Sequence, residues 1–249
     1  MSKICKNYLI FTFLIMLAGW GTCFIFSVNG FTLANNPLLY IPYLIGGLSP
    51  TIASFIAFKT NNVKFMEWLK GIFDFKHNIW SYLFVIIFGI VSVLPQCIIS
   101  GYDNGAPLWT IIYTIPLLLF GGGLEEAGWR YILQPELEKK FNFTISTLIV
   151  AIIWWIWHLP LFFIQDVVQY GQSYFGFGIT VFGLSFALAS LRKNVNSVWL
   201  CVLLHCTINA LNGIYIVNDN IYGKITTAII YIVLSYIIIG IQKKKIIFK

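Results

Sequence analysis

The chain has 249 residues, of which 59% are hydrophobic and only 10% are charged, and its mean hydropathy is +0.82. This composition excludes an ordinary soluble domain and predicts a polytopic membrane protein. The net charge of +7 does not indicate nucleic-acid binding, because the basic residues fall in short clusters between apolar runs, as expected of loops facing an anionic inner leaflet. The five cysteines are scattered and predict no disulfide framework.

The first half of the chain predicts three membrane spans, because an apolar run of about 20 residues can cross the hydrocarbon core. The first run begins near Tyr8 and lacks the cleavage site of a signal peptide, so we expect it to remain as a helix. Residues 59–76 mix apolar and charged side chains at a spacing that fits an amphipathic helix in the interface. The three predicted spans are about 8–28, 38–58 and 79–99.

The second half of the chain predicts five more spans. The fourth span begins near Pro107, and we expect Pro135 to end it. The remaining spans are about 144–164, 175–191, 195–216 and 221–240. The sequence therefore predicts an all-α membrane protein, a bundle of about eight transmembrane helices that forms a single integral membrane domain over residues 1–249.

The charged residues predict how this bundle is oriented. With about eight spans both termini lie on one side, and almost all Lys and Arg clusters fall on that side too, Lys224 being the exception. By the positive-inside rule we expect both termini to be cytoplasmic. The basic clusters are Lys3 and Lys6, residues 59–76, Lys139 and Lys140, Arg192 and Lys193, and the C-terminal lysines at 243–245 and 249.

The fourth span carries the sequence GGGLEEAGWR at residues 121–130, which places two carboxylates and a guanidinium in apolar surroundings. A charged side chain at the bilayer centre costs on the order of 3 kcal/mol, so such groups usually mark a pathway or a reaction site. Glu126 and Arg130 are four residues apart and should form an ion pair. Glu125 then faces the bundle interior, where burial suits it to act as a base near neutral pH. The alternative is a purely structural role for both glutamates.

Two later spans carry histidines. His158 follows Trp154 by one helical turn, and alone it could be a hydrogen-bonded packing residue. His205 and Asn209 are four residues apart and share one helix face. At 1.5 Å per residue, Glu125 and His205 lie about 15 Å from the cytoplasmic ends of their helices and His158 about 21 Å, so the three can meet near the midplane. Glu, His, His and Asn in one cavity have the composition of a hydrolytic site.

These motifs together resemble the pattern of the CPBP family, the CAAX-protease and bacteriocin-processing endopeptidases also called Abi proteins. The similarity extends over about residues 107–216, which we expect to be the catalytic core. The second motif of the family usually begins with Phe, whereas this chain has Trp, and we expect this departure to change packing rather than chemistry. The positions that match the three motifs are Glu125, Glu126 and Arg130, then Trp154 and His158, then His205 and Asn209.

The resemblance implies an intramembrane endopeptidase that hydrolyses a peptide bond in a membrane-associated peptide or protein. Glu125 would activate a water beside His158, while His205 and Asn209 would form the oxyanion hole. The implied site-orienting residues are Glu126, Arg130 and Trp154. The expected partners are this substrate and the lipid bilayer, with no nucleic acid, and the expected location is a bacterial cytoplasmic membrane.

The residues leave the metal dependence open. The family is described both as metal-dependent and as a glutamate-dependent protease without metal. Glu125, His158 and His205 could be three ligands of a Zn²⁺ ion with an open fourth position, but the HExxH helix that commonly supplies such ligands is absent. We favour the metal-free mechanism and expect no cofactor.

Two other classes of function stay open at this point. The same fold could serve as a non-catalytic membrane scaffold or a bacteriocin-immunity protein. Buried Glu and His side chains could also relay protons in a proton-coupled transporter.

Overall fold

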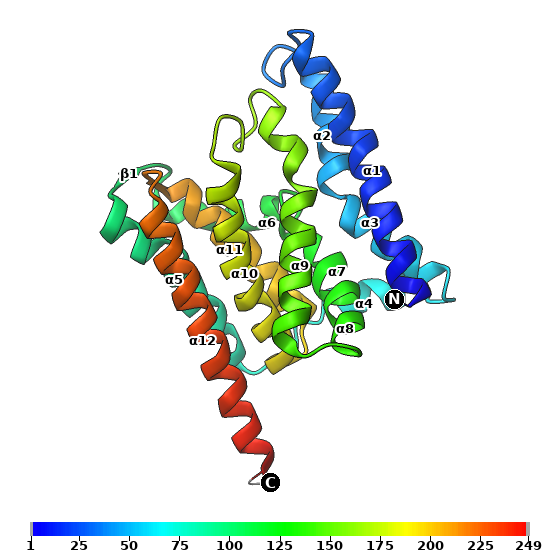
Figure 1. The fold of residues 1–249 in the computed structure, drawn as a ribbon, viewed down its shortest axis with the longest axis vertical. Coiled ribbons are helices and arrows are strands. Elements are labelled where there is room, and N and C mark those ends of the chain that lie inside the picture. Colours follow the sequence, from blue (N-terminus) through cyan, green and yellow to red (C-terminus); the bar gives the residue numbers. More distant parts are fainter. Residues whose placement is uncertain (1, 248–249) are drawn as a thin grey trace.

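The computed structural model describes the backbone of residues 2–247 and the side chains of residues 2–240, and within them the chain is almost entirely helical (Figure 1). The predicted all-α class is confirmed. The helices are α1 (Lys3–Val28), α2 (Tyr40–Gly47), α3 (Ser49–Lys59), α4 (Phe65–Ile72), α5 (Ile79–Ser100), α6 (Ile111–Leu118), α7 (Glu126–Gly128), α8 (Gln134–Glu138), α9 (Phe143–Trp157), α10 (Tyr174–Val195), α11 (Val198–Ile214) and α12 (Ile221–Ile247). Short 3₁₀ helices cover Pro37–Leu39, Leu108–Thr110, Gly123–Glu125 and Leu159–Phe163, and a π-helical turn covers Trp129–Leu133.

The described residues contain five helices that are long and apolar enough to cross a membrane, which makes the chain a multi-pass integral membrane protein. Two bent helix pairs raise this number to seven if each pair counts as one span. α11 is a shorter apolar helix of 17 residues. The count of about eight spans and the cytoplasmic termini stay predictions, and the side chains of the C-terminal lysines lie outside the described residues. The five helices are Lys3–Val28, Ile79–Ser100, Phe143–Phe163, Tyr174–Val195 and Ile221–Gly240.

The fourth predicted span is a broken helix rather than a continuous one. Its two halves, Leu108–Leu118 and Gly123–Glu138, meet at an angle of 43°. Gly122 in the break has a φ of +132°, which residues with a Cβ rarely adopt. The prediction that Pro135 ends this span is wrong, because the helix continues through α8 to Glu138. Pro135 lies in the first turn of α8, where a missing N–H is tolerated.

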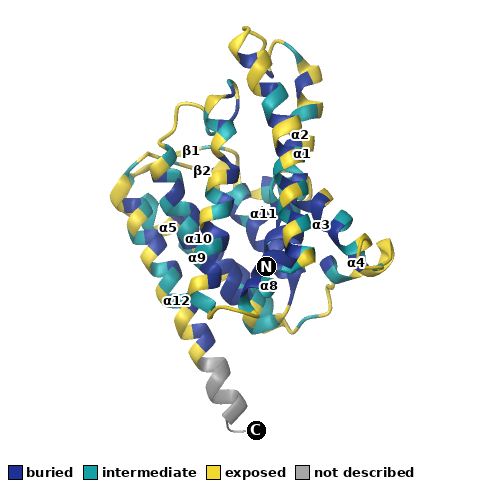
Figure 2. Cartoon of the chain, turned by 45° about the vertical axis from the view of Figure 1, so that its right-hand side comes forward, coloured by how far each residue is buried: buried dark blue, intermediate teal, exposed yellow. Residues whose placement is uncertain are grey.

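The helices pack closely enough to enclose a buried centre. α1 lies along α2 and α3, while α10 packs against α12 and α5 packs against α11 and α12. A Cβ added to Gly19 of α1 would lie 2.5 Å from the backbone of Gly46 in α2, so glycine permits this close approach. Buried residues concentrate at the centre of the bundle (Figure 2). Many large apolar side chains are exposed on its outside. Such an apolar exterior is what contact with lipid requires.

Two short features lie outside the spans. α4 falls within the predicted interfacial helix, and it buries Trp68 and Ile72 while exposing Phe65 and Met66. Two three-residue strands, β1 (Tyr102–Asn104) and β2 (Tyr215–Val217), pair antiparallel and join the end of α5 to the end of α11. This small ribbon was not predicted, since the sequence after α5 has the composition of a turn.

Candidate active site

One cavity of about 200 Å³ brings together the four side chains predicted to be catalytic, which are Glu125, His158, His205 and Asn209. Its walls come from α1, α2, α9, α10, α11 and the break in the fourth span. Further polar side chains, which sequence reasoning missed because no motif marks them, also line the cavity: Tyr43, Gln169, Thr180 and Asn212. The predicted convergence of residues from three separate spans is therefore present in the structure.

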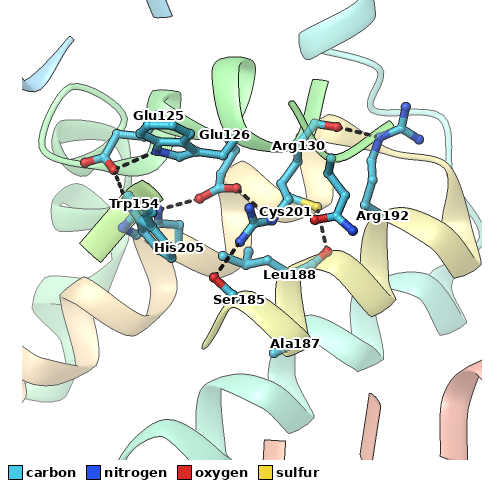
Figure 3. Close-up of polar contacts among 12 residues, drawn as sticks. Glu125, Glu126, Arg130, Trp154, Ser185, Ala187, Leu188, Arg192, Cys201 and His205 are labelled. Atoms are coloured by element: carbon cyan, nitrogen blue, oxygen red, sulfur yellow. Dashed lines mark hydrogen bonds and ion pairs between the residues drawn. The ribbon is translucent and has the colours of Figure 1, made fainter. Parts of the chain in front are cut away.

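Glu125 is fixed through one of its two carboxylate oxygens. The residue lies in the 3₁₀ turn before α7 and is only 7% exposed. Its Oε2 accepts a hydrogen bond from Trp154 Nε1 at 2.8 Å (Figure 3). The same oxygen accepts a second hydrogen bond from Trp129 Nε1 at 3.4 Å. No group among the described residues donates to Oε1. Trp154 thus gives Glu125 a hydrogen bond that a phenylalanine could not give, in addition to its packing.

Glu126 connects two partners inside the bundle (Figure 3). Its Oε2 lies 3.5 Å from Arg130 Nε, so the predicted ion pair is confirmed. Its Oε1 lies 2.9 Å from His205 Nδ1, a contact between helices that spacing along one helix could not reveal. Arg130 is fully buried, donates from Nη2 to Ser185 Oγ at 3.4 Å and lies 5.6 Å from the ring centroid of Trp154. Glu126 therefore supports an imidazole of the site as well as the guanidinium.

The contacts of the two histidines define what each ring can do. His158 Nδ1 lies 2.8 Å from the carbonyl oxygen of Trp154. A carbonyl oxygen only accepts, so Nδ1 carries the proton and Nε2 of the neutral ring holds a lone pair. His205 Nδ1 in the same way donates to the carboxylate of Glu126. These hydrogen bonds hold both imidazoles in one orientation. In each ring Nε2 is the nitrogen that remains free to contact a water or a substrate.

Asn209 and His205 converge beside Gly122. Asn209 Nδ2 donates to the carbonyl oxygen of Gly121 at 3.2 Å. A Cβ added to Gly122 would lie 2.7 Å from Asn209 Nδ2 and 3.0 Å from His205 Nε2. Both nitrogen atoms thus lie beside the space that the missing side chain of Gly122 leaves open.

The three candidate zinc ligands do not form a metal-binding group. Nowhere in residues 2–240 do three His, Cys, Asp or Glu side chains lie close enough together to hold a metal ion. The hydrogen bonds of the site exclude no ligand atom, because Glu125 Oε1 and the Nε2 atoms of His158 and His205 have no hydrogen-bond partner among the described residues. The absence of a cofactor stays a prediction.

Comparisons with known proteins match the part of the chain that holds the cavity residues, and one of them extends over almost the whole chain. A family model described as type II CAAX prenyl endopeptidase Rce1-like matches residues 107–211. The curated CAAX prenyl protease 2 of Methanococcus maripaludis is 23% identical over 265 aligned positions, which cover 96% of this chain and 94% of that protein. The range matched by the family model contains every motif residue of the cavity, from Glu125 to Asn209.

Proposed function

We propose, from the premise that this chain belongs to the CPBP family of CAAX-type membrane proteases, that it hydrolyses a peptide bond in a membrane-associated peptide or protein with a glutamate-activated water. The observation that carries this proposal is the shared cavity, in which a buried carboxylate, two oriented imidazoles and an amide come together inside the helix bundle. A positioned base and donors for a developing oxyanion are what acyl transfer to water requires.

Water activation is assigned to Glu125 and His158. A water beside Glu125 gives a proton to that carboxylate while its oxygen attacks the scissile carbonyl carbon, and the electron pair of the C=O bond moves to the carbonyl oxygen. The lone pair on His158 Nε2 accepts a hydrogen bond from the second O–H of the water and so orients the water. His158 can have this role because its Nδ1–H donates to the carbonyl oxygen of Trp154, which leaves Nε2 as the acceptor.

Stabilisation of the oxyanion is assigned to Asn209 and His205. Asn209 has two amide hydrogens, and the one that does not bond Gly121 is available to the oxyanion. His205 Nε2 donates only when both ring nitrogens carry protons, and Glu126 beside Nδ1 balances that charge. Loss of one such donor typically lowers kcat by about 10²- to 10³-fold. The reaction ends when the protonated Glu125 gives its proton to the amine nitrogen as the C–N bond breaks, which restores the carboxylate.

Cleavage of a membrane-anchored reporter peptide by the purified protein in proteoliposomes tests this proposal. We expect cleavage at a rate that a chelator leaves unchanged, since no step uses a metal ion. Activity that is lost on chelation and restored by Zn²⁺ would contradict the metal-free mechanism. Folded protein that cleaves no member of a reporter panel would instead favour the scaffold function, and proton-coupled solute uptake would favour a transporter.

Substitution of Gly122 by alanine is expected to damage the oxyanion donors. The added Cβ would press on Asn209 and His205, and the φ of +132° is unfavourable for alanine. We expect kcat for the reporter to fall by roughly 10²-fold, the loss that a displacement of about 1 Å can produce. The matched control is Gly47→Ala, which also changes a cavity-lining glycine but places its Cβ 3.9 Å from the nearest atom. Equal kcat values for the two variants would contradict this assignment.

A further inference from the structure

The two indole N–H groups at Glu125 indicate which of its oxygens reacts. We propose that Trp154 and Trp129 form an indole clamp that holds Oε2 of Glu125 in place and leaves Oε1 as the oxygen that takes the proton from water. The clamp consists of the two hydrogen bonds from Trp154 Nε1 and Trp129 Nε1. This inference rests on the proposed function, because it concerns how the base of that reaction is positioned.

The clamp is rigid because both rings are buried and come from separate elements. Trp154 lies in α9 and is 2% exposed, whereas Trp129 lies in the π-helical turn and is fully buried. The Trp154 ring packs against the ring of His205, with centroids 5.5 Å apart. The Trp129 ring packs edge-on against Tyr8 of α1, with centroids 5.8 Å apart. A carboxylate held from two sides in this way has little freedom to rotate.

The chemistry of the indole ring decides which oxygen can be protonated. An indole N–H donates a hydrogen bond but accepts none. A proton on Oε2 would compete with the two N–H groups that already occupy that oxygen, whereas Oε1 receives no hydrogen bond from the described residues. Protonation at Oε1 therefore keeps both hydrogen bonds of the clamp through the whole reaction.

Trp154 positions both members of the water-activating pair through different atoms. Its indole N–H contacts Glu125, and its backbone carbonyl oxygen accepts the Nδ1–H of His158. Replacement by phenylalanine removes the first contact and leaves the second. The resembled motif usually has Phe at this position. The hydrogen bond from Trp154, which is the shorter of the two in the clamp, is therefore a feature of this chain. Trp154 and Trp129 are thus positioning residues, which act through Glu125.

Comparison of Trp154→Phe with Trp155→Phe in the reporter assay tests the clamp. Trp155 follows on the same helix and also loses an indole hydrogen bond, but its Nε1 donates at 3.0 Å to the carbonyl oxygen of Tyr174, outside the cavity. We expect Trp154→Phe to lower kcat by roughly tenfold or more with little change in KM, because the base loses its orientation while substrate binding is kept. Trp155→Phe should keep the wild-type kcat. Trp129→Phe should have a smaller effect than Trp154→Phe, since its hydrogen bond is longer.

A second variant separates loss of the N–H from loss of ring volume. Benzothienylalanine at position 154 keeps the bicyclic shape but has sulfur in place of the N–H, and it should reproduce the lower kcat of Trp154→Phe. Wild-type kcat in both variants would overturn the clamp and leave the proposed function standing. Full activity of Glu125→Gln would overturn both proposals together.

Discussion

Replacement of Glu125 by glutamine should abolish reporter cleavage while the protein remains folded in the membrane. Glutamine has nearly the same shape, and its amide oxygen can still accept the hydrogen bond from Trp154. It cannot accept a proton from water, so the reaction loses its general base. A positioned base contributes about 10²- to 10⁴-fold to the rate, and we expect kcat to fall by that amount with a modest change in KM.

The control for this prediction is Glu138→Gln. Glu138 lies in α8, where it pairs with Lys193 outside the cavity, so this variant removes a carboxylate from the same span without altering the site. Its kcat should equal that of the wild type. Size-exclusion chromatography and a thermal unfolding scan of both variants would check that they are folded. A Glu125→Gln variant with wild-type kcat would show that the residue is not the base and would support a non-catalytic role.

Replacement of Arg130 by methionine should cause the largest loss of stability among single substitutions at the site. Arg130 and Glu126 are both fully buried, and methionine would leave the Glu126 carboxylate without its guanidinium partner. Removal of one member of a buried ion pair typically lowers the free energy of unfolding by about 3–5 kcal/mol. We expect a change of this size in reversible unfolding of the protein in bicelles.

The double variant Glu126→Gln with Arg130→Met distinguishes an unpaired charge from lost packing. If the unpaired carboxylate causes the instability, the double variant should be more stable than Arg130→Met alone. A double variant that is less stable than either single variant would assign the loss to packing around Trp154 and Ser185 instead. Activity should stay low in both cases, because Glu126 also holds Nδ1 of His205.

The positions of the five long apolar helices were predictable because they depend on a property of the local sequence. An apolar run of about 20 residues that crosses lipid must form a helix, because only then are its backbone N–H and C=O groups hydrogen-bonded within the run. The same holds for the pair Glu126 and Arg130, since residues four apart on a helix face the same way. The broken fourth span was harder to predict, because a break depends on how the neighbouring helices satisfy the freed backbone groups.

Contacts between helices could not be predicted, because they depend on how each helix is rotated about its axis. The bond from His205 to Glu126 and the bond from Trp154 to Glu125 are of this kind. The hydrogen bond from Trp129 could have been predicted from spacing, since Trp129 lies four residues after Glu125 and has an N–H donor in its ring. Gln169 carried no such signal: it lies in the segment between the Leu159–Phe163 helix and α10, and only the folded chain brings it to the cavity.

The π-helical turn at Trp129–Leu133 determines how this span can vary in length. A π turn holds about one residue more than an α-helical turn. Deletion of one residue there would restore regular α-helix and would keep Glu125 and Glu126 at nearly the same angular phase relative to α8, because the π turn absorbs the extra residue. Deletion of a residue from a regular α-helical turn between them and α8 would instead rotate the two parts by about 100°, and both carboxylates would lose their present partners. The π turn is therefore the place where this span can lose one residue while the angular phase between its acidic residues and α8 is kept.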